Sequence, residues 1–301
     1  MWFKNLRLYR TQALPFDQSR MQEALEKNTF QTCGALDLYR QGWVSPFGRS
    51  RQALFHHANG CTLVCARRQD KVLPSAVVNE ALEAKIEQIH RDEGRDIGRK
   101  ERRDLKDELI FSLLPKALTR SALHYAYIDH VHNLIVVNAA SAAKAESVLD
   151  LLRESLGSLN ATPLTPHTPS AHVMTAWLRE GQADAPFIFG DQCELRESKE
   201  ERVIRFRHQS LDADEVRQHL ETGMHVSKLH LHWRDTVSFV LEDDFAMKSV
   251  KFGDRLQEEL EQQAGDEADA RLDTEFVLMH SELRVFTKEL LDAAGGEAQT
   301  H

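Results

Sequence analysis

The sequence lacks several features by which other classes of protein are recognised. It has four cysteines in 301 residues, and Cys33, Cys61, Cys65 and Cys193 show neither a CxxC pair nor zinc-finger spacing. Cysteines in this pattern suit a reducing compartment. No apolar run approaches the ~20 residues of a membrane span. The polar N-terminal stretch MWFKNLRLYRTQ predicts no export signal. We therefore expect a cytoplasmic protein that makes no membrane contact.

Catalytic signatures are equally scarce. The sequence has no Walker loop, no GxGxxG after a strand, no GxSxG elbow and no HExxH. His230 and His232 share one face of a predicted strand and could bind a metal with a third ligand, although flanking cations favour a basic strip. Asp243 and Asp244 could hold a divalent ion for phosphodiester cleavage, but a polar turn explains them more simply. We predict neither a cofactor nor a metal.

Positive charge is in deficit overall, with a net charge of −9, yet the charges are segregated along the chain. Acidic residues concentrate late, in 242–244 and 255–273, whereas cations concentrate in 67–71 and 91–120. Whole-chain charge is therefore a poor guide to binding, and a locally positive surface is compatible with an acidic protein.

The stretch Ala81–Lys106 (ALEAKIEQIHRDEGRDIGRKERRDLK) forms a basic stripe when it is interpreted as one helix. Five cations then share an arc of about 80° at ~100° per residue, namely Arg91, Arg95, Arg99, Arg102 and Lys106. Gly94 and Gly98 each weaken this helix by roughly 1 kcal/mol and predict a bend or break. The alternative is an ordinary solvated surface with i,i+4 charge pairs.

Other cations flank this stretch. Arg67, Arg68 and Lys71 precede the helical region, while Lys116 and Arg120 follow it. A chain that leaves and returns to one base would place both groups around the same arm. With Lys85, Lys100 and Arg103 they predict contacts to phosphates that are salt-sensitive and independent of base sequence.

The pattern of elements predicts an α+β fold with mixed or antiparallel sheets, because strands and helices do not alternate regularly. Asn59-Gly60 is the strongest hairpin signal, and a second hairpin is expected over 124–139. We expect Trp43 in a loop. A long helical region should run from about Ser75 to Ser112, with Pro115 ending or kinking it.

Prolines at 163, 166 and 169 mark the predicted domain boundary. We divide the chain into an N-terminal α+β body (1–75 and 122–162) and a helical tip with the basic stripe (76–121). Residues 163–301 make a C-terminal α+β region with acidic terminal helices.

Several blocks of sequence resemble the bacterial recombination-associated RdgC family. They include MWFKNLRLYR, GWVSPFG, KVLPSAVVNEALEAKI, LKDELIFSLLPKAL and LLRESLGSL, and the likeness runs from the first residues to the last few. The resemblance implies a non-enzymatic, nucleoid-associated DNA-binding protein with a projecting helical tip. It also implies a homodimeric closed ring that encircles duplex DNA, restrains the recombinase RecA and influences replication and recombination.

The resemblance also implies roles for particular residues. Leu118 follows the LLP motif where relatives dock an apolar side chain, sometimes a larger aromatic one, into the partner subunit. His208 and Gln209 take the positions of a polar pair linked to ring closure. The family's basic tip segment maps onto Arg91–Arg103. Two alternatives stay open: a metal-dependent nuclease, and a protein-interaction scaffold acting through the acidic C-terminal helices.

Overall fold

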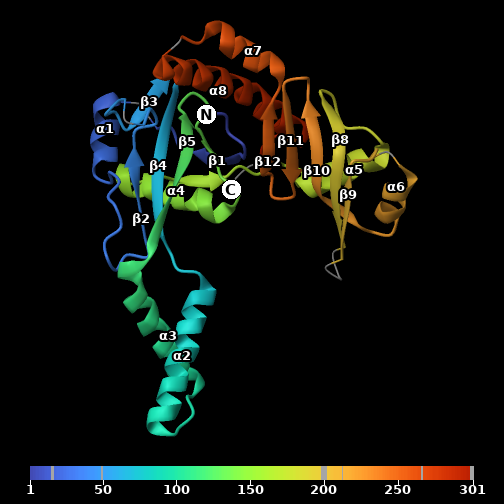
Figure 1. The fold of residues 1–301 in the computed structure, drawn as a ribbon. Helices are drawn as coiled ribbons and strands as arrows, with labels where there is room; N and C mark the ends of the chain where they lie inside the picture. Colours follow the sequence, from blue (N-terminus) through green and yellow to red (C-terminus); the bar gives the residue numbers. More distant parts are fainter. Residues whose placement is uncertain (15–16, 49, 198–201, 212, 266, 299–301) are drawn as a thin grey trace.

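The computed structural model describes residues 1–14, 17–48, 50–197, 202–211, 213–265 and 267–298. Two sheets lie side by side, and a long helix, α8 (Ala268–Ala293), runs across the top of both in Figure 1. All the strand ladders in both sheets are antiparallel. The predicted α+β class with antiparallel sheets is confirmed.

The N-terminal sheet has seven strands, six of them in the order β2-β4-β5-β6-β1-β7. The seventh, β3, pairs with the first residues of β4, and β2 pairs with the residues that follow. Its strands are β1 (Arg7–Thr11), β2 (Tyr39–Val44), β3 (Phe55–Ala58), β4 (Cys61–Val72), β5 (Leu118–Asp129), β6 (Leu134–Val137) and β7 (Ala161–Pro163). Helices α1 (Gln18–Glu26) and α4 (Ala142–Leu156) pack on one face, where Leu25, Trp43 and Leu149 are fully buried in a shared core. Apolar positions every three to four residues on α4 make this packing possible.

Local signals in this half predicted structure well, with two exceptions. Asn59 (φ 48°) and Gly60 (φ 76°) adopt the left-handed backbone that a two-residue hairpin requires. The prediction that Trp43 lies in a loop is wrong: it belongs to β2, and its indole N–H donates to Ser155 Oγ at 2.8 Å. Strand β5 also begins at Leu118, before the hairpin predicted over 124–139, because it pairs with the whole of β4.

The C-terminal sheet has five strands in the order β12-β11-β10-β8-β9. They are β8 (Phe187–Arg196), β9 (Val203–Arg207), β10 (His225–Trp233), β11 (Val237–Glu242) and β12 (Met247–Phe252). Helices α5 (Ser170–Glu180) and α6 (Asp214–Glu221) carry buried apolar side chains that join the core beneath the sheet. The acidic helix α7 (Asp254–Gln263) leads into α8, which is longer than the predicted segment near 282–293.

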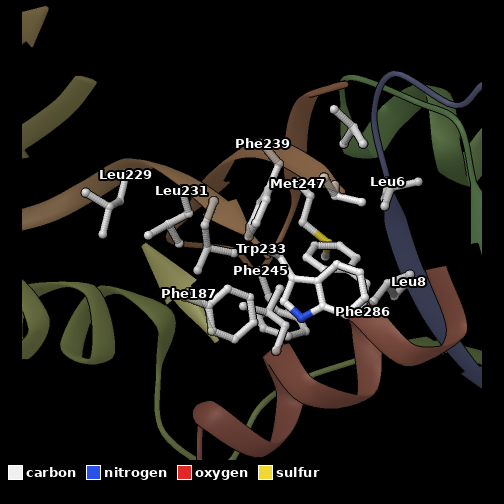
Figure 2. Close-up of a cluster of buried hydrophobic side chains, with 14 of the residues drawn as sticks. Leu6, Leu8, Phe187, Leu229, Leu231, Trp233, Phe239, Phe245, Met247 and Phe286 are labelled. Atoms are coloured by element: carbon white, nitrogen blue, oxygen red, sulfur yellow. The ribbon is translucent and has the colours of Figure 1, made fainter. Parts of the chain in front are cut away.

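One of the two large hydrophobic cores is shared by both sheets. Figure 2 shows Leu6 and Leu8 from the first strand region meeting Trp233, Met247 and Phe286 from the C-terminal half. A backbone bridge between Leu6 and Met247 links the edges of the two sheets, with N···O distances of 2.8 and 3.1 Å. These contacts fix the relative position of the two sheets.

Helices α2 (Ser75–Glu93) and α3 (Arg99–Leu113) form a hairpin that extends away from the sheets in Figure 1. A 3-10 turn, η1 (Leu114–Lys116), contains Pro115 and returns the chain to β5. The hairpin buries Val78, Leu82 and Leu114, which belong to neither of the two large cores. Among the described residues, no helix is both long and apolar enough to cross a lipid bilayer.

Candidate nucleic-acid interface

The stretch Ala81–Lys106 is broken where its glycines predicted a break. Gly94 caps α2 in the left-handed region (φ 67°), its N–H donates to His90 O at 2.9 Å, and α3 starts only at Arg99. The interpretation of five cations on one continuous helix is therefore wrong. Arg91 lies on α2 and Arg95 lies in the connection, so the stripe is divided between two packed helices.

Two of the five predicted stripe cations are paired within the hairpin. Arg95 donates to both carboxylate oxygens of Glu101 at 2.7 and 2.8 Å and to Glu93 at 2.6 Å. The Glu101 bonds, followed by the Glu93 bond, raise the pKa of Arg95 further above its usual value. Arg102 on α3 forms an ion pair with Glu83 on α2. These two arginines hold the hairpin together and are partly neutralised.

The remaining hairpin cations are better placed to meet an external anion. Within the described part of the chain, they have no carboxylate oxygen within 4 Å and all are exposed except the half-buried Lys106: Lys85, Arg91, Arg99, Lys100, Arg103 and Lys106. We call these six residues the free hairpin cations. Because exposed cations on long side chains can reach phosphates without fixed geometry, this set suits contacts that do not read bases.

The cations predicted around the base of the hairpin lie on two faces of a β-ribbon. Strand β4 pairs with β5 as far as Val72, where the chain enters α2. Because side chains alternate along a strand, Arg67 and Lys71 project to one face, and Arg68 and Arg120 project to the other. They therefore cannot all meet one ligand surface.

Local contacts engage both arginines of β4. The Arg67 guanidinium lies 4.7 Å from the Phe30 ring centroid and donates to Ser121 Oγ at 3.1 Å. Arg68 stacks on Tyr39 at 3.9 Å and donates to Asp70 at 2.9 Å. By contrast, Lys116 is exposed on η1, and Arg120 is exposed on the first half of β5.

The three residues predicted for subunit contact lie in two separate places. Leu118 is 80% exposed at the start of β5, two residues after η1 returns the chain from the helical hairpin. His208 follows β9 in the other sheet, has a positive φ of 56° and contacts Asp191 Oδ2 at 3.0 Å through Nδ1. The buried Gln209 Nε2 has no hydrogen-bond partner among the described residues.

Comparison with known proteins agrees with the whole length of the chain. Residues 1–297 match the family described as "RdgC: Putative exonuclease, RdgC". The chain is 41% identical over 299 residues to the "Recombination-associated protein RdgC" of Tolumonas auensis, and 43% identical over 299 residues to that of Edwardsiella ictaluri, with 99% of each chain covered. It is 41% identical over 302 residues to the protein of that name from Aeromonas hydrophila subsp. hydrophila, covering all of both chains. This chain belongs to the RdgC family.

The residues that suggested a metal-dependent nuclease do not gather into one site in this member of the RdgC family. Asp243 and Asp244 lie in the turn after β11, where Asp244 binds Arg7 at 2.8 Å. His230 contacts Asp191 at 2.9 Å, and its ring centroid lies 4.9 Å from that of His232. Among the described residues, no group of three or more histidine, cysteine or acidic side chains could hold a metal ion.

The list of DNA-binding candidates omitted the basic side chains of the C-terminal sheet. Strand β10 (HVSKLHLHW) presents Lys228, His230 and His232 on the face that α5 does not cover, and the neighbouring strands add further cations. The signal was present as cations alternating with apolar residues. The sequence shows this pattern within one strand only. The order of strands in the sheet is needed to show that the cations of β9, β10 and β12 lie on one face.

Proposed function

We propose that this RdgC-family chain binds double-stranded DNA without sequence preference, as a homodimeric ring closed around the duplex. One observation carries the proposal: the free hairpin cations lie on a helical arm that extends away from the sheets (Figure 1), and the exposed Leu118 lies at its base. A basic arm that reads no base edges suits contacts with the phosphate backbone.

A second subunit is part of the proposal because the arm covers only one side of a duplex. In a twofold dimer each subunit presents the same patch to the other. Leu118 offers an apolar contact for such a patch, and His208 with Gln209 offers a polar one in the other sheet. A ring retains DNA by enclosing it, so the outer surface can remain acidic while the inner surface is positive.

The proposed role is to restrain RecA-mediated recombination and to act in replication and recombination on nucleoid DNA. Its support is membership of the RdgC family and relatives named as recombination-associated. A ring that occupies duplex DNA would limit the length available to a recombinase filament. This role needs neither catalysis nor a cofactor.

Two measurements test the binding proposal. First, titration of a 40-base-pair duplex at 50 to 200 mM salt should give log affinity that falls linearly with log salt, by about 0.9 for each phosphate contact. Second, complexes on closed circular DNA should survive a high-salt wash that removes protein from the same DNA after linearisation. A flat salt response would refute electrostatic binding, and equal loss from both DNA forms would refute enclosure.

The principal alternative is a nuclease, which the family description raises. Incubating end-labelled duplex and single-stranded DNA with magnesium or manganese tests it, and shortened products would require an enzymatic function. A third alternative is a scaffold that captures proteins through the acidic helices α7 and α8. It predicts partner capture by a variant in which the free hairpin cations are neutral.

A further inference from the structure

The C-terminal sheet has one apolar face and one charged face. Trp177 and Leu178 of α5 join the core below the sheet, together with Leu229 and Leu231 of β10. The opposite face, which we call the outer sheet face, carries the alternate residues. Its basic side chains come from four of the five strands: Arg196, Arg205, Arg207, Lys228, His230, His232, Lys248 and Lys251.

Two buried carboxylates organise the cations on the outer sheet face. Glu194 is only 4% exposed and accepts hydrogen bonds from Arg205 Nε at 2.8 Å, Arg196 Nε at 3.1 Å and Ser227 Oγ at 3.0 Å. Burial alone would raise the pKa of Glu194, but the Arg205, Ser227 and Arg196 bonds outweigh it and lower the pKa to about 2. Glu194 is thus a fixed negative charge beneath several cations.

The second carboxylate repeats this arrangement two strands away, on β11 at the other side of β10. Glu242 is 7% exposed and lies 2.6 Å from Lys248 Nζ and 3.5 Å from Lys228 Nζ. The two glutamates therefore anchor four cations. Lysine and arginine side chains in such positions keep their charged groups at the surface while their aliphatic parts lie over buried groups.

The outer sheet face keeps an excess of positive charge. Lys251 and Arg207 are exposed and, within the described residues, have no carboxylate oxygen within 4 Å. Among the described residues, the six lysines and arginines of this face therefore outnumber the three carboxylates that form ion pairs there, those of Glu194, Glu242 and Asp191. With strands ~4.8 Å apart, the cations spread over roughly 19 Å from β12 to β9.

Histidines occupy the middle of this basic surface. Asp191 contacts two histidines, one with each carboxylate oxygen. Its Oδ1 lies 2.9 Å from Nδ1 of His230, and its Oδ2 lies 3.0 Å from Nδ1 of His208. His232 lies between Ser238 and Ile188 in the sheet register. Burial, followed by the proximity of His230, lowers the pKa of His232. The charged and titratable groups around the pair are Asp191, His208, Lys228, Arg234, Asp235, Glu242, Lys248 and Lys251.

We propose that the outer sheet face is a second phosphate-binding surface. This inference rests on the proposed DNA-binding function. It adds the outer sheet face, which is distant in sequence from the helical hairpin, as a second surface that contacts the same DNA. Because the surplus cations are spread over the face of a sheet, we expect their contacts to follow the phosphate backbone and not the base edges.

The test removes the charges of Arg207 and Lys251, the two cations of this face that have no carboxylate oxygen within 4 Å among the described residues. Arg207→Gln with Lys251→Gln should lower the magnitude of the log affinity against log salt slope by about 1.8, since each lost phosphate contact is worth about 0.9. The matched control is Arg20→Gln with Lys27→Gln on α1, which changes the net charge equally at exposed positions of the other half. The control should keep the wild-type slope.

The outcomes separate the inference from the proposed function. If the wild-type chain binds duplex DNA and the Arg207/Lys251 variant has the same slope as the control, the second surface is refuted while DNA binding stands. If the wild-type chain does not bind duplex DNA at any salt concentration, the proposed function itself fails. Far-UV circular dichroism and the urea midpoint verify that each variant is folded.

Discussion

Neutralising Arg99, Lys100 and Arg103 should weaken the salt dependence of DNA binding more than neutralising the paired arginine of the same hairpin. These three side chains are exposed on α3 and, in the described structure, have no carboxylate oxygen within 4 Å. Arg95, by contrast, is held by Glu101 and Glu93 at 2.6 to 2.8 Å. A phosphate must displace those carboxylates before it can bind Arg95.

The magnitude follows from counterion release. If each of the three residues makes one phosphate contact, replacing all three with glutamine lowers the slope of log affinity against log salt by about 2.7. Between 50 and 200 mM salt, a change of about 0.6 log units, wild-type affinity should fall roughly 40-fold more than that of the variant. Fluorescence anisotropy with a labelled duplex at four or more salt concentrations measures this slope.

The control keeps the net charge constant. Arg95→Gln with Glu101→Gln removes the best-defined ion pair of the hairpin, and we expect its slope to remain within about one unit of wild type. A larger loss of slope in this control than in the triple variant would refute the division into paired and free cations. It would instead support the single-stripe interpretation, in which Arg95 is a central contact.

Three further predictions concern stability and assembly. Asp129→Ala should lower the free energy of unfolding by about 3 kcal/mol in urea titrations, because the buried carboxylate accepts two backbone N–H groups and pairs with Arg284 at 2.9 Å. Burial opposes ionisation, but these bonds lower the pKa of Asp129, so its contribution is present above about pH 4 and is lost as the pH falls through the lowered pKa. A difference that stays constant as the pH falls below 4 would contradict this. Leu118→Asp should leave the urea midpoint unchanged, because the side chain is 80% exposed, but should yield monomers in sedimentation; a stable dimer would refute its role. Gly42→Ala should cost about 1 to 3 kcal/mol, because its Cβ would lie 2.5 Å from Phe30 Cα, whereas an unchanged midpoint would show that the strand can shift.

Local sequence determined the elements whose causes are local. Asp17 caps α1, accepting the Arg20 N–H at 2.9 Å, because a short acceptor side chain before an amphipathic run satisfies a free donor. Asn59 and Gly60 make a hairpin because few other residues adopt positive φ at low cost. Gly94 ends α2 for the same reason. The hairpin at Asn59-Gly60 and the helix break at Gly94 were predicted from the sequence because no distant partner is involved in either.

Blocks of sequence also determined the family, since they resemble the RdgC family across the whole chain and the match over residues 1–297 agrees. Individual motifs did not reveal chemistry in the same way. The sequence around His230 and His232 was compatible both with a pair of metal ligands and with a basic strip on one strand. Only the tertiary structure distinguished these interpretations, because no group of three or more possible metal ligands gathers among the described residues.

Tertiary structure decided which charges are available and which strands extend. Trp43 joins a strand because β2 pairs with β4, where Trp43 lies opposite Ala66, and Ser155, 112 positions later, accepts its indole N–H. Arg102 is neutralised because α3 folds back on α2 and meets Glu83, a pairing that a one-helix projection could not include. Charge along a sequence is additive, but charge on a surface depends on which carboxylate each cation reaches. That choice is made by packing between distant segments, and it sets the basic surface that this chain presents.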